Sequence, residues 1–98
     1  MRLLNPVYLE LRRKMRNKDY RVAFEEAQLR DLFAVFIGKE RRRKGFSQKR
    51  LASLCGMTQS RLSLLENAGY SCSMNTRTMI RVADALGMRI EVRLGKRQ

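Results

Sequence analysis

Apolar residues recur at helical spacing through most of the chain, and in residues 48–67 they form two short amphipathic segments separated by a glycine. On a helical projection each segment has one apolar face, while its other positions are polar or charged. The inward positions are Leu51, Ala52 and Cys55 in the first segment and Leu62 and Leu65 in the second. The pattern predicts two short helices packed side by side.

Cap and turn residues stand where these two helices need them. Ser47 and Thr58 precede the first turns, where a hydroxyl can accept hydrogen bonds from free backbone N–H groups. Gly56 follows the first helix and can adopt the positive φ that a tight turn between helices requires. Two helices joined by a turn containing glycine form the helix-turn-helix arrangement, whose second helix enters the DNA major groove.

Two further helical segments precede this stretch. Asn5 and Pro6 are typical of a helix start, and apolar positions follow at near-helical spacing up to Met15. Asp19 is a candidate cap for a second segment that runs toward Gly38. The pattern is compatible with one long helix or with two that meet at a kink near residue 28.

The second segment has an apolar stripe wider than a lone surface helix needs, so we expect another subunit or the first helix to cover part of it. Phe33 and Phe36 are expected in the core, and the positions of Tyr20 and Phe24 are left open.

The last third of the chain changes its period. After an expected loop at 68–72, with Gly69 as its turn residue, Ser73 or Asn75 can cap a helix that ends at Gly87. Its expected inward positions are Met79, Ile80, Val82, Ala83 and Leu86. Beyond it, apolar and charged residues alternate, the period-2 pattern of a half-buried strand, with apolar positions Met88, Ile90, Val92 and Leu94. Because no second strand is predicted, its partner would be the same strand of another copy or an edge strand of another protein.

The amino-acid composition narrows the range of possible functions. The 98 residues suffice for one small domain, and 22 Lys and Arg against 9 Asp and Glu give a net charge of +13. Nucleic acid is the commonest anionic partner for such a surplus. With no His and two Cys, one chain cannot assemble a set of metal ligands, and we expect no cofactor. Cys55 fits a core position, and Cys72 lies in the expected loop.

Localisation and catalysis follow from what the sequence lacks. No signal peptide or transmembrane segment is indicated, so we expect a cytoplasmic protein. An enzyme is not expected, because the one paired-carboxylate cluster, Glu25 and Glu26, balances nearby Arg21 and Arg30 on a helix face.

A basic run, KERRRK at residues 39–44, precedes the helix-turn-helix. Cations are favourable at a helix C-terminus, and Gly45 suits the position just past it. The run exceeds what capping requires, so Arg42, Arg43 and Lys44 are candidates for phosphate contact. The alternative is a solvated helix end.

The segment FSQKRLASLCGMTQSRLSLLEN resembles the Cro/CI–Xre family of phage repressors and bacterial regulators. TMIRVADALGM is similar to the family's next helix, so the resemblance covers about residues 36–88. The alternating segment that follows resembles that of HipB-type antitoxins, where it implies pairing between two subunits. The resemblance implies a mainly α, lambda-repressor-like helix-turn-helix bundle with an N-terminal helical extension (1–35), a DNA-binding domain (36–87) and a C-terminal strand (88–98).

The resemblance also assigns roles to residues. It implies phosphate contact by Gln48 and Thr58, and base contact by Gln59 and Arg61, since Gln pairs with adenine and Arg with guanine. Leu64 departs from the polar residue common at its position. The resemblance further implies an ion pair between Arg41 and Glu66. The full expected DNA-contacting set is Gln48, Lys49, Thr58, Gln59, Ser60, Arg61, Ser63 and Asn67, with Arg43 and Lys44.

The sequence thus predicts a homodimeric, sequence-specific repressor of a palindromic operator, with the autoregulating antitoxin of a toxin–antitoxin module as the favoured role. Alternatives are a phage or mobile-element repressor without a toxin, or a protein-interaction module for which DNA binding is incidental. RNA binding is a third possibility from charge alone, but the motif favours duplex DNA.

Overall fold

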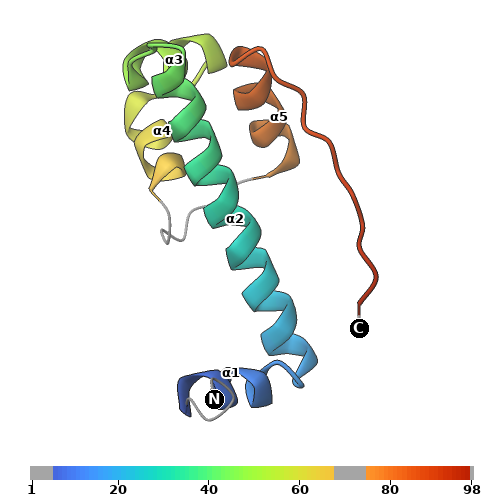
Figure 1. Ribbon diagram of the computed structural model, residues 1–98. Helices are drawn as coiled ribbons and strands as arrows, with labels where there is room; N and C mark the ends of the chain where they lie inside the picture. Colours follow the sequence, from blue (N-terminus) through green and yellow to red (C-terminus); the bar gives the residue numbers. More distant parts are fainter. Residues whose placement is uncertain (1–5, 68–74, 98) are drawn as a thin grey trace.

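The computed structural model describes residues 6–67 and 75–97, which form five helices and an extended C-terminal segment (Figure 1). The helices are α1 (Pro6–Lys14), α2 (Lys18–Arg43), α3 (Gln48–Cys55), α4 (Gln59–Glu66) and α5 (Thr76–Ala85). Helices α3, α4 and α5 surround the C-terminal half of α2, and α1 crosses the far end of α2. The predicted mainly α fold is confirmed.

Helix α2 is a single helix of 26 residues without a break near residue 28, which settles the alternative left open by the sequence. Asn17 caps it: its side-chain oxygen accepts from the backbone N–H of Tyr20 at 2.9 Å. Asp19, the cap expected from sequence, instead lies in the first turn, where its negative charge interacts favourably with the positive end of the helix dipole. The boundary expected between residues 35 and 36 falls inside α2, so a continuous helix joins the extension to the helix-turn-helix.

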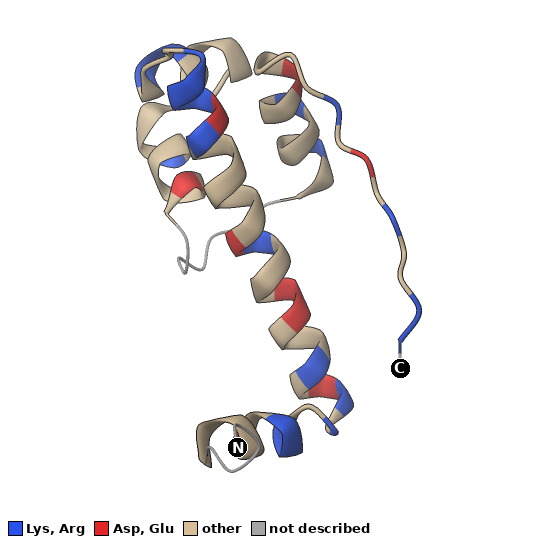
Figure 2. Ribbon diagram, in the orientation of Figure 1, with Lys and Arg blue, Asp and Glu red and all other residues tan. Residues whose placement is uncertain are grey.

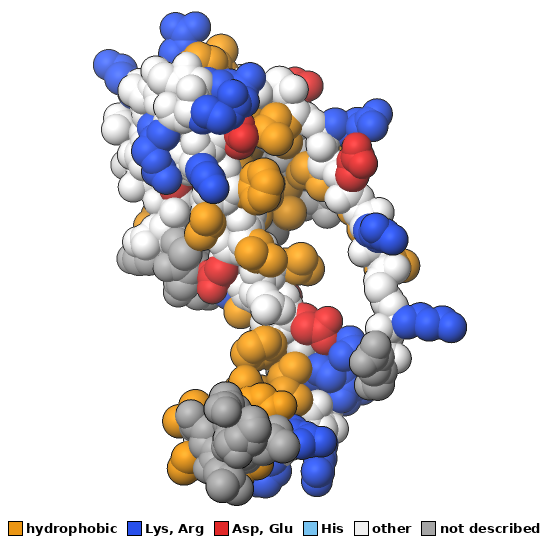
Figure 3. Space-filling model, viewed as in Figure 1, with side chains coloured by type: hydrophobic (Ala, Val, Ile, Leu, Met, Phe, Trp, Pro, Cys, Tyr) orange, Lys and Arg blue, Asp and Glu red, His pale blue; other side chains and the backbone are white. Residues whose placement is uncertain are grey.

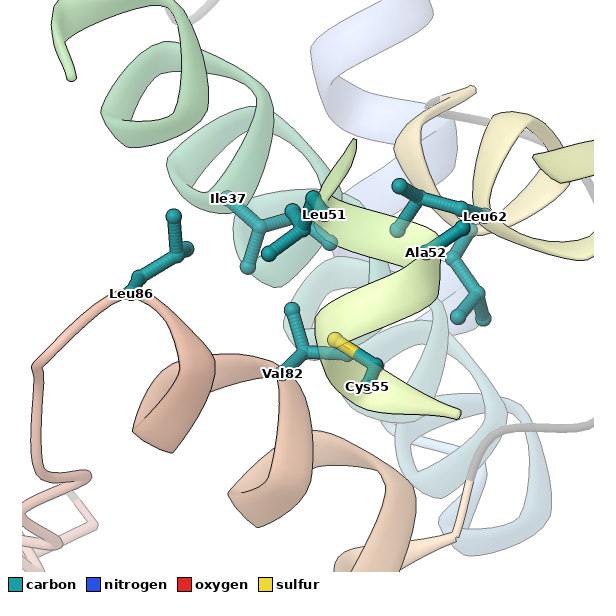
Figure 4. Packing of buried hydrophobic residues seen from close by; sticks show 8 residues of the cluster. Ile37, Leu51, Ala52, Cys55, Leu62, Val82 and Leu86 are labelled. Atoms are coloured by element: carbon teal, nitrogen blue, oxygen red, sulfur yellow. The ribbon is translucent and has the colours of Figure 1, made fainter. Parts of the chain in front are cut away.

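The core joins four helices (Figure 4). Its buried cluster comprises Ile37 of α2, Leu51, Ala52 and Cys55 of α3, Leu62 and Leu65 of α4, Val82 of α5, and Leu86 directly after α5. Helix α1 contributes no buried residue. Burial raises the pKa of the Cys55 thiol against the opposing influence of Arg81, so this cysteine is a protonated core residue.

Two expected core residues are exposed. Phe36 keeps 61% of its surface accessible and Ile80 keeps 53%, so both core assignments were wrong. The inward side of α5 is set by Val82, Ala83 and Leu86, and Ile80 projects beside it. Phe36 faces a groove between α2 and the C-terminal segment, where the single chain supplies no cover. Phe33, by contrast, packs against the core as predicted.

The expected C-terminal strand is absent from the described residues. Residues 88–97 run as an extended segment beside α2, hereafter the tail (Figure 1). The backbone N–H of Met88 bonds to the carbonyl of Ala83 at 2.8 Å, and the later tail residues find no backbone partner within the described chain. A ladder needs a neighbouring strand to pair with, and one copy provides none. The assignment of Met88, Ile90, Val92 and Leu94 to a strand is therefore corrected for the single chain.

Other expectations concern residues outside the described ranges. These are Asn5 as the first cap, the 68–72 loop with Gly69 and Cys72, and Ser73 as a cap. Asn75, the alternative to Ser73, does cap α5, with its side chain accepting from the N–H of Thr78 at 2.8 Å.

Candidate nucleic-acid interface

The turn between α3 and α4 sets the direction of the second helix. Gly56 has φ +71°, and the N–H of Met57 bonds to the carbonyl of Ala52 at 2.9 Å. Ser47 and Thr58 cap α3 and α4 as predicted, accepting from the N–H groups of Arg50 and Arg61. The capped turn therefore begins α4 in a fixed orientation against α3.

Helix α4 presents a polar outer face. Leu62 and Leu65 are buried, which turns the intervening positions outward. The exposed residues are Thr58, Gln59, Ser60, Arg61, Ser63, Leu64 and Asn67, which include every residue of α4 and its caps that the sequence placed at DNA. Side chains that can donate and accept hydrogen bonds on an exposed helix are what direct readout of base edges requires.

A buried ionic network fixes α2, α3 and α4 to one another. Arg41 donates to Glu66 through Nε at 2.7 Å and Nη2 at 3.1 Å, and its Nη1 donates to the carbonyl of Phe46 at 2.8 Å. The Arg41 and Glu66 side chains are only 12% and 6% exposed. The structure thus contains the ion pair that the sequence indicated, and it joins the C-terminal ends of α2 and α4.

Gln48 belongs to the same network. Its Nε2 donates to Glu66 Oε1 at 3.2 Å, an interaction that the sequence did not indicate. The side chain therefore spans from the buried carboxylate toward the N-terminus of α3. Nε2 carries a second hydrogen, so the bond to Glu66 orients the amide without using all its donor capacity.

Basic residues gather beside the start of α3 (Figure 2). Arg42, Arg43 and Lys44 end α2, and Lys49 and Arg50 follow in the first turn of α3. Arg43 bonds to Glu40 through Nε at 2.8 Å, so part of its charge is locally balanced. The guanidinium of Arg50 lies 5.1 Å from the centre of the Phe46 ring, a cation–π arrangement that holds it in place. Arg50 was not singled out from the sequence, although its four-residue spacing from Phe46 was available.

Arg81 is a second residue that sequence reasoning missed. It lies on α5, and its Nη2 donates to the carbonyl of Cys55 at 2.9 Å, at the C-terminal end of α3. A bond over 26 residues has no local sequence signal. It ties the turn before α4 to the helix that follows the motif.

Two capped helices meet at a glycine turn, the second has a polar outer face, and basic residues lie beside the first. This geometry defines a helix-turn-helix DNA-binding protein. The family model described as "Helix-turn-helix domain" matches residues 19–95, and the chain belongs to that family. The match begins at the start of α2 and extends into the tail, so both lie within the family's domain. No curated protein and no solved structure matches the chain.

Residues 6–67 and 75–97 contain neither a membrane-spanning helix nor a cluster of metal ligands. None of the described helices has both the length and the apolar character needed to cross a membrane. No group of three or more His, Cys, Asp or Glu in these ranges is placed to bind a metal ion.

Proposed function

We propose that this DNA-binding regulator is a homodimeric, sequence-specific repressor of the Cro/CI–Xre type that binds a palindromic operator. The observation that carries the proposal is the outer face of α4, where Gln59 and Arg61 lie exposed. The basic side chains at the end of α2 and the start of α3 would contact phosphates and fix the position of the protein along the DNA. Arg61 and Gln59 would contact the edges of the nucleobases.

Dimerisation would allow the protein to recognise a palindromic operator. A small helix-turn-helix module reads only a few base pairs, and a two-fold dimer places two such helices about 34 Å apart, one turn of B-DNA. The tail supplies a candidate contact, because its unpaired backbone and exposed Val92 and Leu94 have no partner within the described chain. Such an edge pairs readily with another strand.

Within this class we favour the autoregulating antitoxin of a toxin–antitoxin module. The resemblance of the tail to HipB-type antitoxins supports it. So does the arm formed by α1 and the N-terminal half of α2, which projects from the core and exposes Val7, Leu9 and Val22 to a prospective protein partner. A mobile-element repressor would use the same DNA interface with no toxin on the arm.

The test is the substitution Arg61→Ala, measured by gel shift on DNA from upstream of the gene and on random duplex. Loss of a base contact should weaken specific binding by about 1–3 kcal/mol and leave binding to random duplex nearly unchanged. Arg12→Ala is the matched control, because it removes the same charge from the distant arm. If Arg61→Ala and Arg12→Ala bind the upstream DNA equally, α4 does not read sequence, and a protein-interaction module becomes the better account.

A further inference from the structure

One of the three leucines of α4 is exposed. Leu62 and Leu65 are buried, at 0% and 1% exposure, whereas Leu64 keeps 38% of its surface accessible. In the space-filling view, exposed apolar side chains gather along α2, and the surface over α3 and α4 is mostly polar and basic (Figure 3). Leu64 is therefore an apolar residue in polar surroundings, on a different helix from the apolar surface of α2.

Helix geometry places Leu64 on the same side of α4 as two of the polar residues expected at DNA. Ser60 and Arg61 lie four and three positions before it, about one turn away, and both are exposed. Side chains on a helix lean toward its N-terminus, so the Leu64 side chain extends toward these two residues. Leu64 therefore continues the outer face of α4 about one turn beyond Arg61.

The chemistry of the major groove selects the base that an exposed leucine can contact. Thymine is the only base whose major-groove edge carries a methyl group, and the other bases present hydrogen-bond donors and acceptors there. A leucine packed against a thymine methyl group buries apolar surface on both partners, which is favourable. Against an edge without a methyl group, the same leucine would exclude water from polar groups and replace none of the lost hydrogen bonds. Thymine is therefore the favoured contact among the four bases.

We propose that Leu64 is a specificity-determining residue that contacts the C5-methyl group of a thymine in each half-site of the operator. The inference rests on the proposed function and adds one base to those that Gln59 and Arg61 would contact. Three residues of an α-helix rise about 4.5 Å, and successive base pairs of B-DNA are about 3.4 Å apart. The thymine should therefore lie within about two base pairs of the base that Arg61 contacts.

Replacing thymine by uracil tests the contact, because uracil lacks the methyl group and forms the same base pair with adenine. The DNA upstream of the gene and a random duplex of equal length are each prepared with thymine throughout and with uracil throughout. Gel shift then measures the affinity of the wild-type chain and of Leu64→Ala for the four duplexes. Burial of one methyl group contributes about fourfold in affinity, so wild type should lose about that factor per half-site when uracil replaces thymine in the upstream duplex. The random duplex measures any effect of uracil that does not depend on specific contacts.

Three variants separate the role of Leu64 from a general effect of truncating a leucine. Leu64→Ala no longer reaches the methyl group, so it should bind the thymine and uracil forms of the upstream duplex equally. Leu54→Ala is the matched control, because it makes the same truncation at a leucine of α3 that is 53% exposed. It should keep the full preference for thymine. Leu64→Met retains an apolar side chain of similar reach and should keep most of that preference.

The four duplexes also distinguish failure of the methyl contact from failure of the proposed function. Specific binding of the upstream duplex by wild type, with equal affinity for its thymine and uracil forms, overturns the methyl contact and leaves the repressor intact. A preference for thymine that persists in Leu64→Ala, or that is lost equally in Leu54→Ala, overturns the role of Leu64. Equal binding of the upstream and random duplexes by wild type overturns the proposed function together with the methyl contact.

Discussion

At the level of single residues, the ion pair between Arg41 and Glu66 links α2 to α4. The two residues are 25 positions apart, and only resemblance to a known motif made the pair predictable. The additional bond from Gln48 and the contact of Arg81 with Cys55 were not predictable, because each depends on how separate helices pack. Neither residue type nor spacing signals them.

Glu66→Ala would leave the Arg41 guanidinium buried without its carboxylate. Breaking one partner of a buried pair costs about 3–5 kcal/mol, and we expect that loss in the free energy of unfolding from urea titration. The control is Arg43→Ala, which removes an ion pair whose arginine is 65% exposed, and it should cost no more than about 1 kcal/mol. Similar losses for the two variants would show that the Arg41–Glu66 pair contributes little.

At the level of elements, helix ends were more predictable than helix faces. The caps Ser47, Thr58 and Asn75 follow from local chemistry, and the structure confirms them. Asn17, which caps α2, and Asp19 lie two residues apart, and helix propensity does not decide between two cap candidates so close together. The exposure of Phe36 and Ile80 depends on tertiary neighbours that a helical projection does not contain.

The turn glycine Gly56 can be compared with Gly45, which has nearly the same φ of +74°. A Cβ at Gly45 would meet nothing within 4 Å, whereas at Gly56 it would lie 2.9 Å from Arg81 Nη2. Gly45→Ala should therefore cost only the backbone strain, about 1–2 kcal/mol. Gly56→Ala should cost about 1 kcal/mol more, because the bond from Arg81 to Cys55 must also shift. Both values come from urea titration, and equal losses would deny Arg81 its role at the turn.

At the level of the whole molecule, the sequence indicated an apolar surplus on α2 and a tail without a partner in its own chain. Both features are present: Leu29, Leu32 and Phe36 are exposed, and the tail backbone beyond Met88 has no backbone partner within the described residues. The strand itself could not be predicted for one copy, since a strand exists only with its neighbour. The arm is the remaining separate feature, because α1 adds nothing to the buried core.

Deleting residues 1–16 removes α1 and retains Asn17 as the cap of α2. Because α1 lies at the end of α2 opposite the helix-turn-helix, operator affinity at physiological salt should stay within about threefold of the full chain, roughly 0.65 kcal/mol. Gel shift over a series of salt concentrations measures it. A loss of tenfold or more, with a shallower salt dependence, would place the basic arm at the DNA backbone.

The proposed repressor function requires a dimer that recognises a specific operator. The most direct measurement combines its mass in solution, by light scattering, with its affinity for DNA upstream of its own gene and for random duplex of equal length at physiological salt. We expect a dimer that binds the upstream DNA at least about a thousandfold more tightly than random duplex. A monomer, or equal binding to both duplexes that disappears as salt rises, would contradict it, because counterion release alone would then explain the binding.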